Sequence, residues 1–158
     1  MVGAFVFREK LIELKSLGLL GIFLINFFGN ATVFFPAPAI VSVVAGGAIY
    51  PPLLVALSSG LGAALGDMIG FMFGASGKML FIKQNFKWYE GLKGGFQKAG
   101  DVIIFVFAFI PNPFFDIIGV VAGVFRYSPR RFFVLLFAGR FIRGIILAYI
   151  GSALGAAY

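Results

Sequence analysis

Residues 109–123, with the sequence FIPNPFFDIIGVVAG, combine an apolar composition with a break in the backbone. Pro111 and Pro113 flank Asn112, and Asp116 follows three residues after the second proline. Proline removes a backbone donor and clashes with the preceding helical turn, so a helix cannot continue unchanged through this stretch. A bilayer tolerates interrupted backbone only where protein or an aqueous cavity satisfies the freed polar groups. The stretch therefore predicts a polar break inside the protein between two short apolar arms.

The composition of the whole chain is that of a membrane protein. Of its 158 residues, 61% are hydrophobic and 12% are charged, whereas soluble domains carry about 25% charged residues. The mean hydropathy is +1.03. A chain of this length accommodates one domain, so we expect a single membrane domain over residues 1–158.

The residue types that are missing limit the chemistry. The chain has no cysteine and no histidine, which excludes disulfide and thiolate chemistry and removes the usual proton shuttle and the commonest metal ligand. We expect no cofactor, no metal site and no enzymatic activity. The pair of aspartates at positions 67 and 116 resembles the signature of intramembrane aspartyl proteases only faintly, because the order of the two elements is reversed.

Apolar runs predict an all-α integral membrane architecture. Residues 16–35, 53–75 and 132–157 are each long enough to span a bilayer, which takes roughly 20 residues. Residues 76–100 alternate lysines with apolar residues at three- and four-residue spacing, which favours an amphipathic helix at the membrane interface. Three glycines are expected to interrupt the second half of that helix: Gly91, Gly94 and Gly95.

The backbone break recurs earlier in the chain. Pro36-Ala37-Pro38 interrupts an apolar run as Pro111-Asn112-Pro113 does, and an Ala-Gly pair, a proline, a full-length apolar run and a closing glycine follow both. The corresponding residues are Ala45-Gly46, Pro51 and Gly74 in the first copy, and Ala122-Gly123, Pro129 and Gly151 in the second. The chain therefore contains an internal repeat.

Each copy predicts a re-entrant hairpin followed by a transmembrane helix. The segments between the prolines are too short to cross the bilayer, and such segments occur at membrane depth only where their backbone is satisfied. We expect the first unit over about residues 30–75, after an N-terminal membrane helix, and the second over about residues 101–157. If the linker 76–100 stays on one face, the second unit is inverted relative to the first, an arrangement typical of transporters.

The distribution of basic residues orients these units. Five lysines lie within residues 76–100 and three arginines within residues 126–131, and cytoplasmic segments carry such an excess. We expect the linker in the cytoplasm and the C-terminus outside. The N-terminus is expected in the cytoplasm if residues 16–35 span, as favoured here, and outside if this run is only a hairpin arm. The basic clusters flank apolar runs, so the net charge of +7 indicates membrane orientation rather than nucleic-acid binding.

Charged residues inside the predicted spans mark a candidate site. Asp67 lies 8 residues before Ala75, and Arg140 lies 9 residues after Arg131. At about 1.5 Å per residue, both lie roughly 12–14 Å from the cytoplasmic end. Arg143 follows one turn later. A charge at this depth costs at least about 2.5–3.5 kcal/mol, so these side chains are expected to face the interior and to pair.

Two interpretations of this cluster stay open. Asp67 and Arg140 alone would form a buried salt bridge that joins the two units. With Arg143 the cluster carries an excess positive charge, which either Asp116 or an anionic ligand would balance. Asp116 would alternatively cap the helix that restarts after the break.

Small residues surround Asp67 and favour close packing of another helix. Four glycines form one ridge at four-residue spacing, which lets helix backbones approach each other. They are Gly62, Gly66, Gly70 and Gly74.

Four stretches resemble the DedA/VTT-domain family (SNARE-associated Golgi proteins), closest to its YqaA-like branch: GNATVFFPAP, LGAALGDMIGF, FIPNPFFDIIGVVAG and GRFIRGIILAYIG. The resemblance covers about residues 20–155. It implies two opposed re-entrant hairpins and a role in moving lipids, including the flipping or scrambling of phospholipids and polyprenyl phosphates, with proton coupling as an option. It assigns Asp67 to the family's acidic position in a Gly-Asp/Glu helix, and Arg140 and Arg143 to the basic positions of the last span. Many members carry acidic residues around the first Pro-x-Pro, where this chain has Gly29-Asn30 and Ile40, which argues against a proton site in the first hairpin.

The sequence thus predicts a lipid flippase or scramblase whose arginines bind phosphate head groups. Asp67, Asp116, Asn112, Arg140 and Arg143 are the expected transport residues. The alternatives are a proton-coupled transporter of a small anion or drug, in which an aspartate carries the proton, and a structural or assembly protein. The expected partners are membrane lipids with anionic head groups and no nucleic acid; proton coupling and homo-oligomerisation stay open.

Overall fold

All regular structure in the described part of the chain is α-helical, as predicted. The computed structural model describes residues 18–31, 36–77, 88–110 and 115–157. The first helix is Gly18–Ala31. It is followed by α2 (Pro36–Ile49), α3 (Pro52–Ala75), α4 (Trp88–Phe109), α5 (Phe115–Val124) and α6 (Pro129–Ala156).

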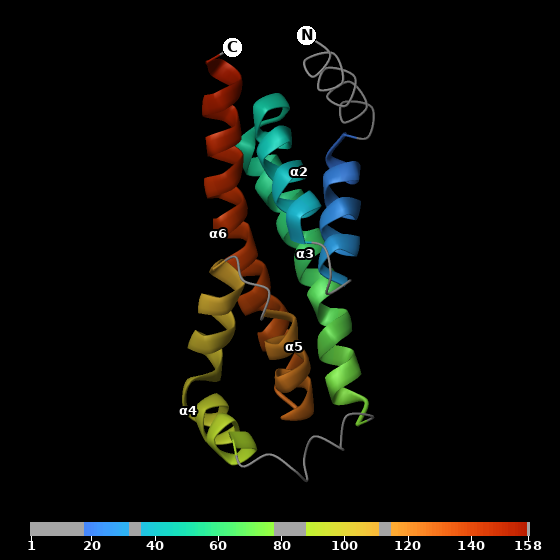
Figure 1. The fold of residues 1–158 in the computed structure, drawn as a ribbon, viewed down its shortest axis with the longest axis vertical. Coiled ribbons are helices and arrows are strands. Elements are labelled where there is room, and N and C mark those ends of the chain that lie inside the picture. The colour runs from blue at the N-terminus through green and yellow to red at the C-terminus, as the bar shows by residue number, and fades with distance from the viewer. Residues whose placement is uncertain (1–17, 32–35, 78–87, 111–114, 158) are drawn as a thin grey trace.

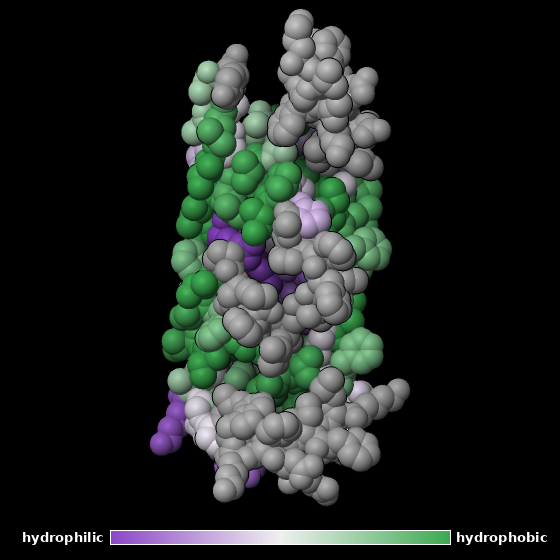
Figure 2. All heavy atoms as spheres, viewed as in Figure 1, coloured by the Kyte–Doolittle hydropathy of each residue, from purple (hydrophilic) through white to green (hydrophobic). Residues whose placement is uncertain are grey.

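Two of these helices, α3 and α6, are long and apolar enough to cross a membrane. They have 24 and 28 residues, or about 36 and 42 Å at 1.5 Å per residue. Both start on a proline, Pro52 or Pro129, because the first turn needs no backbone donor there and the ring already has a helical φ. They correspond to the spans predicted over residues 53–75 and 132–157. Figure 2 shows hydrophobic side chains over much of the surface of the described residues, as a lipid-facing surface requires.

The structure describes only residues 18–31 of the span predicted over residues 16–35, so a continuous crossing by this run stays a prediction. Gly18 has φ +59°, so the right-handed helix begins there and cannot extend back through it. The described helix Gly18–Ala31 is a shorter apolar helix of 14 residues, or about 21 Å, against a hydrocarbon core of about 30 Å. Residues 32–35 lie outside the described part of the chain.

The first half of α4 occupies the predicted amphipathic segment, but the break in this segment lies elsewhere than expected. Gly91, Gly94 and Gly95 are inside α4, and a side chain at any of them would meet nothing within 4 Å. The kink is instead at Ala99, with φ −139° and ψ 23°. Figure 1 shows the two halves of α4 pointing in different directions: the first lies across the end of the bundle and the second runs beside α6. Residues 78–87 lie outside the described residues.

Short helices enter the bundle from both of its ends (Figure 1). Gly18–Ala31 runs from one end towards the middle, and α2 returns from the middle to that same end. The second half of α4 and α5 make the same path from the opposite end, while α3 and α6 run along the whole bundle. Each pair of short helices is therefore placed beside a long helix at one end of the molecule.

The glycine ridge of α3 packs against two short helices, one after the other. A Cβ at Gly62 or Gly66 would clash with the backbone of the Gly18–Ala31 helix, at Phe23 and Phe27. Further along α3, Gly74 leaves room for the backbone of α5 at Val120. The predicted ridge thus serves both units rather than one interface. Gly70 lies between these contacts and is half-buried.

The two crossings between a long helix and the short helix of the other unit use corresponding glycines. A Cβ added at Gly47 of α2 would clash with the Ala148 carbonyl of α6, and one added at Gly151 of α6 would clash with the Val44 carbonyl of α2. The crossing of α5 and α3 shows the same reciprocal contacts: a Cβ added at Gly123 would clash with the Phe71 carbonyl, and one added at Gly74 would clash with the Val120 carbonyl. The packing therefore aligns Gly123 with Gly47, one residue later than the Gly46 of the sequence alignment.

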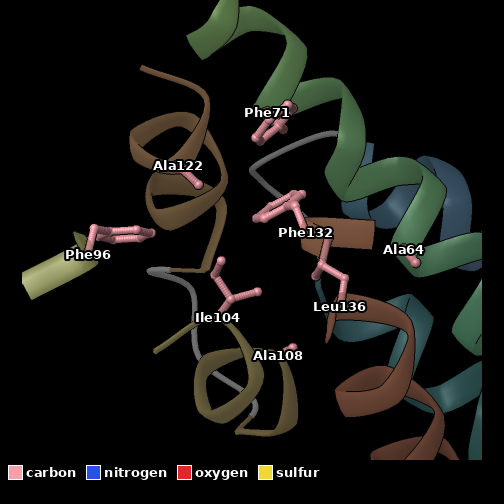
Figure 3. Packing of buried hydrophobic residues seen from close by; sticks show 8 residues of the cluster. All are labelled: Ala64, Phe71, Phe96, Ile104, Ala108, Ala122, Phe132 and Leu136. Carbon is pink, nitrogen blue, oxygen red and sulfur yellow. The ribbon is translucent and has the colours of Figure 1, made fainter. Parts of the chain in front are cut away.

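The larger hydrophobic core lies between α3, α4, α5 and α6. Figure 3 shows Phe71 of α3 and Phe132 of α6 facing each other, and their ring centroids are 4.7 Å apart. Phe96, from the first half of α4, points towards α5. A smaller core joins the Gly18–Ala31 helix to α2, α3 and α6 through four buried residues: Ile22, Val43, Val55 and Ala148.

Candidate functional site

A buried ion pair joins the two long helices. The Nη2 and Nε groups of Arg140, on α6, donate to Oδ2 of Asp67, on α3, at 2.7 and 3.0 Å. The side chains are 9% and 1% exposed. A lone charge at membrane depth costs at least about 2.5–3.5 kcal/mol, so each group offsets the burial of the other. The sequence prediction that these two residues face inward and pair agrees with this geometry.

Small residues on both helices make this contact reachable. A Cβ at Gly144 of α6 would lie 3.1 Å from the Cα of Ala56, and one at Gly60 of α3 would lie 3.3 Å from the Cα of Phe141. The backbones of α3 and α6 therefore approach closely beside the ion pair. This close approach holds Asp67 and Arg140 within hydrogen-bonding distance.

Arg143 adds a second cation one helical turn beyond Arg140. Its side chain is half-buried, and it lies within electrostatic range of both Arg140 and Asp67. It has no ion pair within the described part of the chain. The three side chains together carry a formal charge of +1, with one carboxylate for two guanidinium groups.

The charge cluster lies deep in the bundle. Arg143 is 14 residues after Pro129 in the 28-residue helix α6, which places it about 21 Å along a length of about 42 Å. Figure 2 shows hydrophilic atoms at mid-height, between hydrophobic surfaces above and below them. A cationic group is therefore available about half-way across the membrane-spanning part of the molecule.

A second polar cluster links the first two short helices. Asn26 donates through Nδ2 to the Ile22 carbonyl at 2.8 Å and to Oγ of Ser42 at 3.1 Å. Ser42 in turn donates to the Ala39 carbonyl at 2.7 Å, and both polar side chains are buried. This contact was missed from the sequence. Asn26 within an apolar run was the available signal, because a buried amide needs partners.

The predicted residues at the breaks are placed only in part. Pro36 and Pro38 belong to the first turn of α2, where proline is tolerated, and the preceding described helix ends at Ala31, so their role as the break of the first hairpin stays a prediction. Asp116 is the second residue of α5, and the surroundings of its side chain lie outside the description. Three other predicted residues fall outside the described part of the chain: Pro111, Asn112 and Pro113.

Comparison with known proteins gives one result that covers most of the chain. The family model described as the VTT domain matches residues 35–153, a segment that contains α3, most of α6 and all three charged residues of the cluster. Searches against curated proteins and against solved structures found no match. The match confirms the family that the sequence motifs indicated, while the YqaA-like branch stays a prediction. The chain belongs to the VTT-domain (DedA) family of membrane proteins.

Proposed function

We propose that this protein transports lipids between membrane leaflets, as a flippase or scramblase for phospholipids or polyprenyl phosphates. Its family consists of membrane proteins thought to be transporters or flippases. The observation that carries the proposal is the position of Arg143: half-buried at mid-length of α6, next to an arginine that Asp67 already neutralises. The head-group phosphate is the anion that Arg143 would bind.

Charge balance favours an anionic substrate at this site. The Asp67–Arg140 pair is neutral as a unit, and Arg143 leaves a formal charge of +1 at a depth where charge is costly. A phosphate in contact with Arg143 would compensate this charge. Arginine suits this role because its planar fork donates two hydrogen bonds to one phosphate, whereas lysine offers a compact charge.

The arrangement of the short helices supports access from both leaflets. We propose that Gly18–Ala31 with α2, and the second half of α4 with α5, are re-entrant hairpins that open to opposite faces. The corresponding glycine crossings, Gly47 with Gly151 and Gly123 with Gly74, support an inverted repeat. Inverted repeats place their substrate site near the midplane, between broken helices, where Arg143 lies.

The charge distribution supports one orientation of this multi-pass protein. Among the described residues, five exposed cations lie at one end of the bundle: Lys93, Lys98, Arg126, Arg130 and Arg131. Residues 144–157, at the other end, contain no charged residue. We therefore place the α3–α4 linker in the cytoplasm and the end of α6 outside. With Gly18–Ala31 as a hairpin arm, its start lies on the outer face, which replaces the cytoplasmic N-terminus expected from the sequence.

One observation favours the alternative of proton-coupled transport of a small anion. Asp67 is a buried carboxylate, and protonation would release Arg140 for an incoming anion. This alternative predicts uptake of a soluble anion that depends on a pH gradient. Lipid scrambling proceeds without such a gradient. We propose no enzymatic step, cofactor or nucleic-acid partner in either case.

The test is transport by the purified protein in liposomes. Head-group-labelled phosphatidylglycerol, phosphatidylcholine and a polyprenyl phosphate are each incorporated in trace amounts, and a membrane-impermeant quencher reports the fraction in the outer leaflet. We expect the accessible fraction to exceed the outer-leaflet half when the protein is present. Protein-free liposomes are the control. If no labelled lipid exchanges but a soluble anion accumulates under a pH gradient, the alternative replaces the proposal.

A further inference from the structure

A second site lies at the basic end of the molecule, apart from the charge cluster. A cleft of about 640 Å³ opens between the first half of α4 and the turn that joins α5 to α6. Lys93 and Gln97 line it from α4, and Phe125 and Arg126 line it from the turn. None of these residues belongs to the Asp67–Arg140–Arg143 cluster.

The lining of this cleft combines an apolar surface with cations. The rings of Phe96 and Phe125 contact each other across it, with centroids 5.5 Å apart. Lys93 and Arg126 are both exposed, and Glu90 is the acidic residue of the lining. The formal charge of the lining is therefore +1. A phosphate with an attached apolar group matches this combination better than a free inorganic anion does.

The backbone at Arg126 indicates a role for its side chain. The turn is a Schellman motif: the Tyr127 N–H donates to the Ala122 carbonyl and the Arg126 N–H to the Gly123 carbonyl, both at 3.0 Å. Arg126 occupies the left-handed position of this motif, with φ 53°, where glycine carries no steric cost and other residues do. The chain places an arginine at a position that backbone energetics alone would assign to glycine.

The ring contact of Phe96 with Phe125 joins the first half of α4 to the turn, and the turn is also held to the second half of α4. The hydroxyl of Tyr127 donates to Oδ1 of Asp101, so the turn is bonded to α4 immediately after its kink. The ring of Tyr127 also packs on Gly100, where an added Cβ would lie 3.2 Å from it. The cleft is therefore preformed. A preformed site binds with less loss of conformational entropy than one that must be ordered.

We infer that this cleft binds the head group of an anionic phospholipid at the cytoplasmic interface. Lys93 and Arg126 contact the phosphate, Gln97 donates a hydrogen bond, and the half-buried Phe125 contacts the glycerol and the first carbons of the acyl chains. The position is suitable because α6 begins at Pro129, three residues after Arg126, so the cleft borders the membrane-spanning region. A lipid bound here would hold the first half of α4 at the membrane surface.

The test measures lipid binding by the full-length protein in detergent. Native mass spectrometry gives the dissociation constants for dioleoyl phosphatidylglycerol and for dioleoyl phosphatidylcholine. We expect the wild type to prefer phosphatidylglycerol, and Lys93→Gln/Arg126→Gly to lose about tenfold or more of this preference. Glycine at position 126 keeps the turn, so thermal stability is expected to be unchanged or higher.

A matched double variant separates this site from general attraction to basic residues. Lys98→Gln/Arg130→Gln removes the same charge from exposed positions of α4 and α6 that do not line the cleft. We expect it to change the preference less than about twofold. An equal loss in both double variants would overturn the inference, because the basic face as a whole would then attract the lipid.

Two further arms identify the source of the phosphate and the site. Inorganic phosphate is expected neither to raise the thermal unfolding temperature nor to displace bound phosphatidylglycerol. Displacement at millimolar phosphate would assign the cleft to a free anion and overturn the lipid assignment. In protein that also carries Arg143→Leu, the double substitution Lys93→Gln/Arg126→Gly is expected to cause the same loss of preference for phosphatidylglycerol. If the double substitution causes no such loss in Arg143→Leu protein, the bound lipid is at Arg143 and not in the cleft.

Discussion

Arg140 donates two hydrogen bonds to a single carboxylate oxygen of Asp67, 73 positions away in the sequence. The contact joins the two long helices at the depth where the bundle also holds Arg143. It accounts for two of the three charges inside the spans and leaves Arg143 as the cation that has no ion pair in the described residues. The structural role of the pair and the proposed role of Arg143 can therefore be tested separately.

The ion pair is expected to show strong coupling in a double-mutant cycle. Asp67→Ala leaves the guanidinium of Arg140 buried without its carboxylate, and removing one partner of a buried pair costs about 3–5 kcal/mol. Asp67→Ala/Arg140→Ala removes both charges and is expected to be less destabilised than Asp67→Ala alone. Thermal unfolding in detergent measures these two variants and Arg140→Ala, the third member of the cycle. Additive losses would show that the pair does not interact in the folded protein.

Glycines at the helix crossings and glycines on α4 are expected to respond in opposite directions to alanine. Gly74→Ala and Gly151→Ala place a Cβ against a backbone carbonyl that cannot move aside, and such overpacking costs about 1–3 kcal/mol. Gly91→Ala and Gly94→Ala meet nothing within 4 Å, so helix propensity should stabilise each by about 0.5–1 kcal/mol. Urea or thermal unfolding of the four single variants tests this. Equal effects at the two kinds of position would contradict the described packing.

The proposed orientation can be tested directly because the native chain has no cysteine. Single cysteines replace Ser76, Ser128 and Ala157, which are all exposed. We expect the cysteines at 76 and 128 to react with an impermeant thiol reagent only from the cytoplasmic side, and the cysteine at 157 only from outside. Labelling of positions 76 and 157 from the same side would exclude the inverted arrangement of the two units.

Much of the helical architecture was predictable from the sequence because a bilayer imposes strong constraints. Pro52 and Pro129 are the first residues of the two long helices, and the length and apolar composition of the runs after them indicated transmembrane helices. The approach of Asp67 and Arg140 was predictable from their matched depth, because an unpaired charge there is costly. These inferences needed only the cost of polar groups in an apolar environment.

The remaining features depend on local backbone angles and on contacts that the sequence does not specify. Gly18 takes a positive φ, which glycine permits but does not require, so the start of the first helix was not predictable. The helix is continuous through Gly94 and kinked at Ala99, although alanine has a higher intrinsic helix propensity than glycine. The contact between Asn26 and Ser42 depends on how two short helices pack.

Substitution of Arg143 tests the central proposal most directly, by head-group exchange in liposomes together with thermal unfolding. We expect Arg143→Leu to abolish exchange without lowering stability, because it removes the half-buried cation and leaves the Asp67–Arg140 pair intact. Arg143→Lys keeps the charge but loses the bidentate fork, so exchange should fall by about tenfold or more. Arg131→Leu, an exposed arginine at the start of the same helix, is the matched control and should exchange lipid like the wild type. Wild-type exchange by folded Arg143→Leu protein would contradict the account and leave the arginines with a structural role only.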